Sequence, residues 1–315
     1  MCTAISEIGK YHLFGRTLDL EGSYGESVVI TPRKFALRFL HEESMGEHTA
    51  IIGIAHVSEG IPLYYDAMNE EGLAIAGLNF PGNAVYNEPR EGYFNVASFE
   101  LIPFVLAKCK SVIEARELLK RTNLTNDSFS KELPTTPLHF IISDKEGCIV
   151  VEPLGDGLKI YENPPRVLTN NPTFDFHLTN LSNFMALSSV TPKNELCPGV
   201  PLNCYSRGMG AMGLPGDYSS ASRFVRAVFA KNHTSHKGGD ERGEVNRFFH
   251  IMDTVSVPCG CVKTDEGRDV LTVYTSCGCA ETGKYYYTTY ENRTPRVISF
   301  ADVPLSSSEL FPLKM

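Results

Sequence analysis

The chain of 315 residues lacks tryptophan, lacks a block of charge of either sign and lacks any long apolar run. Its 29 basic and 37 acidic side chains are interspersed and give a formal net charge of −8, which disfavours nucleic acid or anionic lipid as a partner. No apolar stretch approaches the ~20 residues that a membrane-spanning helix needs, so we expect that the chain does not cross a membrane. The first ten residues do not resemble a secretory signal, and we therefore expect a cytoplasmic location.

The sequence contains nine cysteines, an odd number. Disulfides are rare in the cytosol, and a chain of this length buries enough apolar surface to fold without them. We therefore expect most of the thiols to be small buried side chains. The cysteine at position 2 is the one for which this interpretation is weakest.

Short segments rich in β-branched and aromatic residues, separated by turn residues, predict strands. They cover residues 2–8, 11–20, 27–32, 49–57, 61–68, 73–80, 138–143, 148–153, 158–162, 167–169, 270–277, 285–290 and 297–300. Apolar residues at helical spacing predict helices over 96–108, 111–121, 176–187, 220–232 and 243–255. Strands and helices come in clusters without regular alternation, which favours an α+β fold with mainly antiparallel sheets. No linker or repeat divides the chain, so we predict a single domain over 2–315.

Position 2 decides whether the initiator methionine is removed, and a side chain as small as that of Cys2 permits removal. The mature chain then begins with a residue that carries both a thiol and a free α-amine. These groups have ordinary pKa values of about 8.5 and about 8, so together they form a nucleophile and its own general base. The alternative is that Cys2 is only a small buried residue in an edge strand.

Two charged residues follow on the next predicted strand. Arg16 and Asp19 are three positions apart, which places them on opposite faces of a regular strand. A guanidinium beside Cys2 would favour the thiolate, and a carboxylate near the amine would orient it. The alternative is a pair of exposed strand charges.

Three further residues lie at the ends of predicted elements. Asn79 and Asn170 each follow a strand, where asparagine usually serves a turn but is also suited to an oxyanion hole. Arg223 lies in the first turn of a predicted helix, where its charge opposes the helix dipole. That unfavourable position indicates a specific role.

Together these motifs resemble the choloylglycine hydrolases, N-terminal-nucleophile amidases that include bile salt hydrolases and penicillin V acylases. The matching segments are M-C-T at the N-terminus, F-G-R-x-L-D, N-E-E-G-L-A-I-A-G-L-N-F-P-G, L-T-N-N-P-T-F-D-F-H, G-L-P-G-D-Y-S-S-A-S-R-F-V-R and Y-T-S-C. They extend from residue 2 to about residue 300 in the family's order. The resemblance implies a four-layer αββα sandwich with two stacked antiparallel sheets.

The resemblance also implies a role for each of these residues. Cys2 would be the nucleophile and its freed α-amine the base, with Arg16 and Asp19 beside it. The side chain of Asn170 would bind the oxyanion, with Asn171 as an alternative register.

Two further roles are implied in the same way. Asn79 would offer its backbone N–H to the oxyanion, and Arg223 would support the surroundings of the nucleophile. The reaction would be hydrolysis of bile acids conjugated to glycine or taurine, without a metal or organic cofactor. Family members often form tetramers, so a homo-oligomer is expected.

Two features of the sequence concern the expected substrate site. The G-L-N-F-P segment is similar to the bile-salt branch, because penicillin V acylases tend to carry tyrosine where Asn79 stands. Apolar and aromatic residues near the active strands would line a sterol pocket, with core packing as the alternative reading. They are Leu18, Leu20, Tyr24, Tyr65 and Leu133. Penicillin V, acyl-homoserine lactones, or binding of a bile acid without turnover are the alternative functions.

Two C-x-C pairs near the C-terminus contain four thiols, a number that could bind zinc. A hairpin centred near Gly267 would bring Cys259 and Cys261 opposite Cys277 and Cys279. Their spacing differs from the usual C-x₂-C knuckle, however, and alternate strand residues share a face in any case. We therefore expect no metal.

Overall fold

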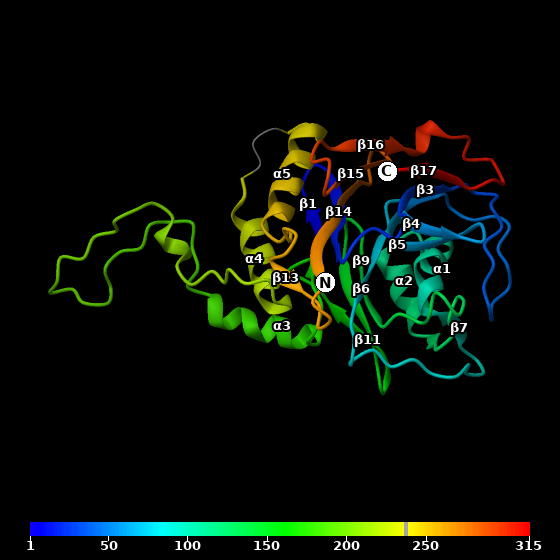
Figure 1. Cartoon of the computed structure of the whole chain (residues 1–315), viewed down its shortest axis with the longest axis horizontal. Coiled ribbons are helices and arrows are strands. Elements are labelled where there is room, and N and C mark those ends of the chain that lie inside the picture. Colours follow the sequence, from blue (N-terminus) through cyan, green and yellow to red (C-terminus); the bar gives the residue numbers. More distant parts are fainter. Residues whose placement is uncertain (236–238) are drawn as a thin grey trace.

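The computed structural model describes residues 1–235 and 239–315, and its centre consists of two stacked antiparallel sheets (Figure 1). The first sheet has the order β12-β1-β2-β14-β15-β16, with β13 also pairing with β14. Its strands are β1 (Cys2–Ile8), β2 (His12–Leu20), β12 (Val167–Leu168), β13 (Val262–Lys263), β14 (Asp269–Cys279), β15 (Lys284–Thr289) and β16 (Arg296–Ser299).

The second sheet has the order β11-β10-β9-β6-β5-β4-β3-β17. Its strands are β3 (Ser27–Thr31), β4 (Ile51–Ser58), β5 (Ile61–Asn69), β6 (Ala74–Asn79), β9 (Leu138–Ser143), β10 (Cys148–Leu154), β11 (Gly157–Glu162) and β17 (Phe311–Lys314). A separate parallel pair joins β7 (Phe94–Ala97) to β8 (Thr122–Thr125). The last strand, β17, brings the C-terminal segment back beside β3.

Helices cover the outer face of each sheet. α1 (Leu101–Lys108) packs on β4, β5 and β6, and α2 (Val112–Leu119) packs beside α1. On the other side, α4 (Ser220–His233) contacts β1 and β12, while α5 (Glu241–Asp253) contacts β2 and β14. α3 (Phe174–Asn180) lies against α4. The predicted α+β sandwich with two stacked antiparallel sheets is confirmed.

Local sequence explains where several helices begin. Ser111 caps α2 by accepting a hydrogen bond from the backbone N–H of Glu114, and Ser219 caps α4 in the same way. Asp240 caps α5 through the N–H of Gly243. Each cap satisfies a donor that the first turn of a helix would otherwise leave unpaired.

Two hydrophobic clusters form the interior. One fills the space between the sheets and continues beneath α4 and α5, with Phe14, Ile141 and Phe248 among its members. The other lies between the second sheet and helices α1 and α2, and includes Ile75 and Phe104. Both faces of the central strands are therefore buried, which explains their nearly continuous apolar sequences.

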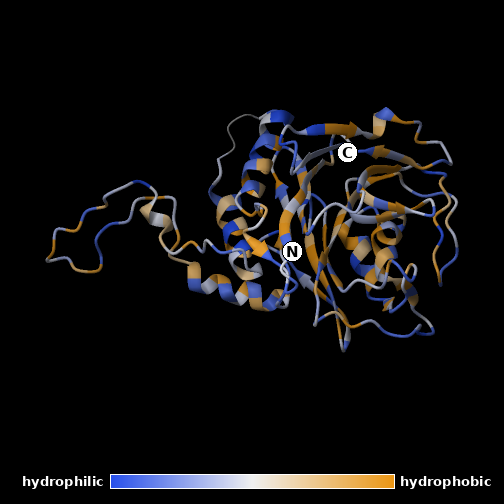
Figure 2. Cartoon of the chain, viewed as in Figure 1, coloured by the Kyte–Doolittle hydropathy of each residue, from blue (hydrophilic) through white to orange (hydrophobic). Residues whose placement is uncertain are grey.

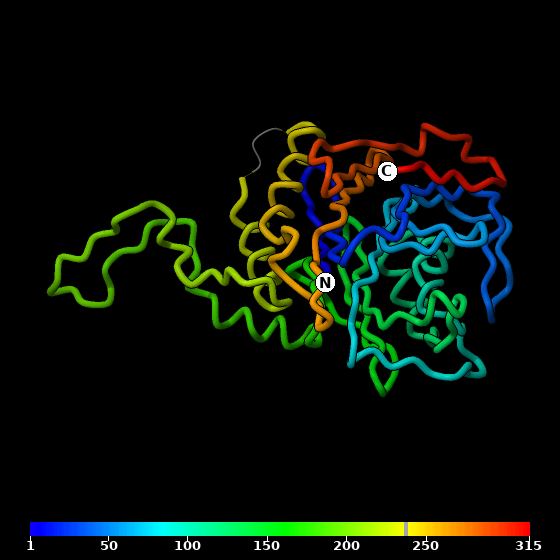
Figure 3. Tube along the Cα trace, viewed as in Figure 1, coloured from blue at the N-terminus to red at the C-terminus, as the bar shows by residue number. Residues whose placement is uncertain are grey.

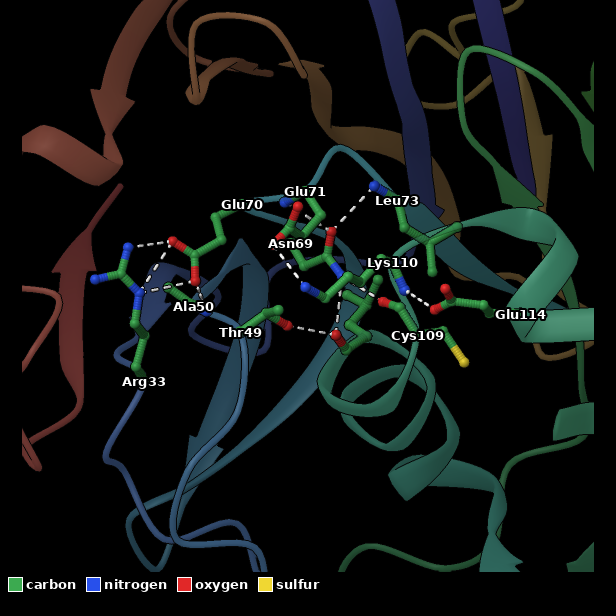
Figure 4. Close-up of polar contacts among 11 residues, drawn as sticks. Arg33, Thr49, Ala50, Asn69, Glu70, Glu71, Leu73, Cys109, Lys110 and Glu114 are labelled. Carbon is green, nitrogen blue, oxygen red and sulfur yellow. Dashed lines mark hydrogen bonds and ion pairs between the residues drawn. The ribbon is translucent and has the colours of Figure 1, made fainter.

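The turn between β5 and β6 shows how the second sheet is joined to its helices (Figure 4). The side-chain amide of Asn69 donates to the carbonyl oxygens of Leu106 and Cys109 at 2.9 and 2.8 Å, at the end of α1. Its oxygen accepts from the backbone of the turn itself, which closes on Gly72 with φ of 92°. The predicted tight turn at 69–72 thus also anchors α1.

Two predicted helices differ from the structure. The segment predicted as helix over 96–108 begins as strand β7 and a 3-10 turn at Ser98–Glu100, because Phe94–Ala97 pairs with β8. The helix predicted over 176–187 starts earlier, at Phe174, and changes to 3-10 geometry at Leu181–Phe184. β8, β13 and β17 were not predicted.

The predicted register of the C-x-C pairs is wrong. β13 pairs with β14 at Val262↔Val270 and Lys263↔Asp269, a register that does not bring Cys259 or Cys261 opposite Cys277 or Cys279. Cys277 and Cys279 instead pair with residues of β15, and both are buried, whereas Cys259 and Cys261 are exposed. Among residues 1–235 and 239–315, no three His, Cys, Asp or Glu side chains are arranged to hold a metal ion.

The chain between α3 and α4 projects away from the body as a long arm, residues 185–219 (Figures 1 and 3). Its single regular element is a 3-10 turn at Met209–Ala211. Hydrophobic residues alternate with hydrophilic ones along the arm (Figure 2). Several of its large apolar and aromatic side chains are exposed, among them Leu196 at 90% and Tyr205 at 83%. No helix in the described part of the chain is long and apolar enough to cross a membrane.

Candidate active site

Cys2 is the first residue of β1, which lies between β12 and β2. It is 2% exposed and pairs with Leu18 across β2. Because paired residues share a face of a sheet, and Ala4 pairs with Arg16, the side chains of Cys2, Leu18 and Arg16 all face the second sheet. The thiol therefore lies in the layer between the two sheets.

Asn170 joins the start of β1 to the end of β6. Its side-chain oxygen accepts from the backbone nitrogen of Cys2 at 2.8 Å, and its Nδ2 donates to the carbonyl oxygen of Asn79 at 2.7 Å. Asn171 instead donates to Pro81 on the surface. Of the two asparagines left open by the sequence, Asn170 is the one that contacts Cys2.

The backbone of Asn170 is held on both sides. Its N–H donates to Ser220 Oγ at 2.8 Å, and its carbonyl oxygen accepts from His177 Nε2 at 2.9 Å. Burial lowers the pKa of His177 to about 4, so the ring is neutral at pH 7 and Nε2 carries the donated proton. Sequence reasoning missed this histidine, although it ends the L-T-N-N-P-T-F-D-F-H motif.

Arg223 lies in the first turn of α4, as predicted, and is fully buried. Its Nη1 donates to the carbonyl oxygen of Cys2 and to Thr3 Oγ1, and its Nη2 donates to Asn170 Oδ1 at 2.8 Å. Burial lowers the pKa of Arg223, and the charge of Asp19 opposes that effect. This guanidinium fixes β1 and Asn170 relative to each other.

Arg16 lies on the same face of the first sheet as Cys2. Its Nη1 donates to the carbonyl oxygens of Tyr65 and Gly77 at 3.1 and 2.5 Å, so the side chain bridges the two sheets. Burial opposes its charge, but the pKa is raised by negative charge on Cys2 and on other nearby groups. Nη2 is buried without a hydrogen-bond partner among the described residues.

A buried carboxylate that the sequence analysis missed lies near Arg16. Asp66 accepts hydrogen bonds from Tyr274 Oη at 2.7 Å, from Ser276 Oγ at 2.9 Å and from Tyr285 Oη. Burial raises the pKa of Asp66, whereas Arg16 lowers it. The signal was present in the Y-T-S-C run, since alternate strand residues 274 and 276 face the same side.

Asp19 lies on the other face of β2, as the three-residue spacing predicted. Its carboxylate accepts from Thr17 Oγ1 at 3.1 Å and from Thr272 Oγ1 at 2.7 Å. Burial raises the pKa of Asp19, and the charge of Arg223 partly offsets this. The backbone of Asp19 pairs with Met1 at the end of the sheet, through a 3.0 Å bond to the Met1 carbonyl oxygen.

A cavity of about 430 Å³ opens beside this group of residues. Tyr24, Tyr65 and Leu133, three of the five predicted pocket residues, line it. Gly77 also lines it, so the two carbonyl groups bound by Arg16 belong to residues of the cavity wall. Its lining further includes Leu63, Phe99, Phe129, Pro134 and Leu138.

The two remaining predicted pocket residues lie elsewhere. Leu18 is 3% exposed and packs in the core between the sheets, and Leu20 is half-buried against the same core. Neither is among the residues that line the cavity. Both side chains point from β2 toward the second sheet, as the side chain of Cys2 does, but they contribute to the core and not to the cavity wall.

Comparison with known proteins identifies the family. Residues 2–312 match the model for linear amide C–N hydrolases, choloylglycine hydrolase family. The chain is 48% identical to the bile salt hydrolase/transferase of Lactiplantibacillus plantarum, over 100% of this chain and 97% of that one. It is 37% identical to the Clostridium perfringens protein of the same name, over 98% and 95%.

Solved structures agree with these sequence matches. A crystal structure of a conjugated bile acid hydrolase variant from Clostridium perfringens superposes with a TM-score of 0.93 at 36% identity, covering 100% of this chain and 97% of that one. Penicillin V acylase from Agrobacterium tumefaciens, at 21% identity and a TM-score of 0.77 over 98% and 90%, shares the fold. The chain belongs to the choloylglycine hydrolase family of linear amide C–N hydrolases.

Proposed function

We propose that this protein hydrolyses the amide bond of bile acids conjugated to glycine or taurine. Cys2, exposed as the first residue by removal of Met1, is the nucleophile. The observation that carries the proposal is the convergence of Asn170 and Arg223 on the backbone of Cys2, next to a largely apolar cavity. The names of the relatives support the choice of substrate.

The proposed reaction has two halves. In the first, the Cys2 thiolate attacks the acyl carbonyl carbon, and the second Nδ2 hydrogen of Asn170 and the backbone N–H of Asn79 bind the oxyanion. The α-ammonium of Cys2 gives a proton to the departing amine as the C–N bond breaks. In the second, water attacks the thioester, the α-amine takes up its proton, and the free bile acid leaves as the C–S bond breaks.

The surrounding charges suit this sequence of events. Arg16 supplies positive charge on the same face of the sheet as Cys2, while Asp19 lies on the other face of β2, toward Arg223. Arg223 keeps the strand carrying Cys2 in register with Asn170. None of these steps calls for a metal or an organic cofactor.

The size and the lining of the cavity are suited to binding an apolar, rigid acyl group. Its volume of about 430 Å³ lies within the usual range of small-molecule sites, and Tyr24, Tyr65 and Leu133 supply aromatic and apolar surface. Side-by-side assays with glycocholate, taurocholate and penicillin V test the assignment. We expect hydrolysis of the two bile salts at rates at least tenfold above that of penicillin V. A preference for penicillin V, or bile-salt binding without turnover, would overturn it.

We further propose that the chain forms one domain over 2–315 and acts as a cytoplasmic homo-oligomer, with a tetramer as the family-like form. The arm supports assembly, because exposed apolar groups such as Leu196 and Tyr205 are typical of interaction surfaces. Light scattering of the wild-type protein and of a Leu196→Ser, Tyr205→Ser variant tests this. The wild type should have the mass of an oligomer, and the variant should have a lower mass. A wild-type mass equal to that of a monomer would contradict the proposal.

A further inference from the structure

A buried histidine, His139, contacts both chain segments that carry the proposed oxyanion donors. It lies on β9 and is fully buried. Its ring stacks on the ring of Phe80, with centroids 4.1 Å apart and an angle of 9° between the planes. Its Nε2 lies 2.8 Å from the carbonyl oxygen of Thr169. Phe80 and Thr169 are adjacent in sequence to Asn79 and Asn170, so one side chain contacts both segments.

The two segments also meet directly. Nδ2 of Asn170 donates to the carbonyl oxygen of Asn79 at 2.7 Å. The N–H of Phe80 donates to the carbonyl oxygen of Pro137, beside β9, at 2.8 Å. Main-chain groups of consecutive strand residues point to opposite sides, so the N–H of Asn79 points away from β9, to the side of its carbonyl oxygen. A shift of either segment would therefore change the distance between the two proposed donors.

The partners of the His139 ring determine where its protons lie. A carbonyl oxygen only accepts hydrogen bonds, so Nε2 must carry the hydrogen that points to Thr169. Nδ1 lies 3.2 Å from Oε1 of Glu152, a fully buried residue of β10. One proton lies between Nδ1 and Oε1, and the other stays on Nε2. Glu152 thereby fixes the orientation of the ring and the donor at Nε2.

Glu152 also holds the segment that follows Asn170. Its Oε1 accepts from the backbone N–H of Phe174, the first residue of α3, at 2.9 Å. Asn170 thus lies between Thr169, which His139 holds, and α3, which Glu152 holds. Burying two ionisable groups is costly even when they are paired, and apolar side chains could fill the same space at a lower cost. The pair is therefore better explained by positioning than by stability.

We propose that His139, oriented by Glu152, is a positioning residue for the oxyanion hole. It holds the N–H of Asn79 and the side chain of Asn170 at the separation that one oxyanion requires. The proposal rests on the proposed function, because it concerns the oxyanion of that reaction. Both donors must lie about 2.7–3.1 Å from the same oxygen atom in the transition state. A small displacement of either should therefore slow the chemical step more than it weakens substrate binding.

A double variant, His139→Phe with Glu152→Gln, tests the proposal. Phenylalanine keeps a ring that can stack on Phe80, and the glutamine oxygen can still accept from the N–H of Phe174. Both ionisable groups are removed together, so no buried charge is left unpaired, while the donor to Thr169 is lost. The kcat for glycocholate should fall by about 10- to 100-fold, whereas KM should stay within about twofold of wild type.

His12→Gln is the matched control. His12 is a buried histidine of β2 whose Nε2 lies 3.2 and 3.3 Å from the hydroxyl oxygens of Ser6 and Ser143. Its kcat should stay within about twofold of wild type. Thermal unfolding measures how far each variant is destabilised, and the assays are run below both transitions. An unchanged kcat in the double variant, a rise in KM alone, or equal losses in the two variants would overturn the proposal.

A crystal structure of the double variant gives a readout that does not depend on the substrate. The distance from Asn170 Nδ2 to the Asn79 carbonyl oxygen should increase from 2.7 Å to more than about 3.5 Å, beyond hydrogen-bond range. An unchanged distance would overturn the proposal. Failure of the proposed function is a different result, because the wild type would then prefer penicillin V or turn over neither substrate. The altered distance, and a loss of kcat with penicillin V where it is hydrolysed, would still support the role of His139.

Discussion

The two faces of the second sheet are built in different ways. The face toward α1 and α2 packs against apolar side chains such as Phe104 and Leu106. The face toward the first sheet carries the fully buried Asp66 and contacts the fully buried Arg16, which shares its face of the first sheet with Cys2. Burying a charge is costly unless it is paired. One face therefore stabilises the fold by apolar packing, while the other accommodates buried charges beside the proposed active site.

The largest effect is expected at the nucleophile. Cys2→Ala should lower kcat for glycocholate by about 10⁴-fold or more, because the residue that forms the covalent intermediate is lost. The melting temperature should change little, because alanine is small and apolar and fits the same site. Activity assays and thermal unfolding of purified protein check both parts. Retained turnover would refute the role of Cys2.

The apolar face should respond in the opposite manner. Phe104→Ala removes a fully buried ring from the layer beneath α1 and should cost about 3–5 kcal/mol in the free energy of unfolding. At temperatures where the variant is folded, kcat should stay within about twofold of wild type. Urea unfolding and activity assays measure the two quantities. A large loss of kcat in the folded variant would show that the face toward α1 also contributes to catalysis, which would contradict the division between the two faces.

The two neighbouring asparagines provide a matched pair. Asn170→Ala should lower kcat by about 10²–10³-fold, the usual loss for an oxyanion donor, while Asn171→Ala should have a minor effect. The physical reason is that Asn170 contacts Cys2 and Arg223, whereas Asn171 contacts Pro81 on the surface. Steady-state kinetics with glycocholate decides the point. The reverse order of the two losses would contradict the geometry.

The smallest effect concerns pH. Burial lowers the pKa of His177 from 6.5 to about 4. Between these two pH values the histidine is protonated in the unfolded chain but neutral in the folded chain. Its contribution is fully present above about pH 6.5 and is lost as the pH falls toward 4, with a magnitude of about 3 kcal/mol. Urea unfolding at pH 7.5 and 4.5 should show a smaller loss for His177→Gln than for wild type. Identical losses would rule out this contribution.

Most of the sandwich could be predicted from local sequence, because alternating or continuous apolar segments bounded by turns specify strands. The exceptions depend on distant partners. β7 and β8 form only because Phe94–Ala97 pairs with Thr122–Thr125. The predicted pairing of the C-x-C segments is wrong because β13 pairs with only two residues of β14, and the rest of β14 pairs with β2 and β15. Short-range patterns contain no information about such competition.

The residues of the site likewise divide into those that local sequence predicts and those that depend on distant partners. Cys2, Arg16 and Asn170 were predicted from motifs that are continuous in sequence, and the structure brings them together. Asp66 and His177 were missed, since each acts through residues on other elements. Asp66 meets Tyr274 and Tyr285 from the facing sheet, and a buried histidine cannot be told from a core residue by its neighbours in sequence.

One measurement tests the central claim most directly. Glycocholate hydrolysis is compared for the processed protein and for the same sequence that retains Met1, with each N-terminus verified by mass spectrometry. Turnover should occur only when Cys2 is the first residue, because only then does the proposed nucleophile have a free α-amine. Equal hydrolysis by the form that retains Met1 would contradict it.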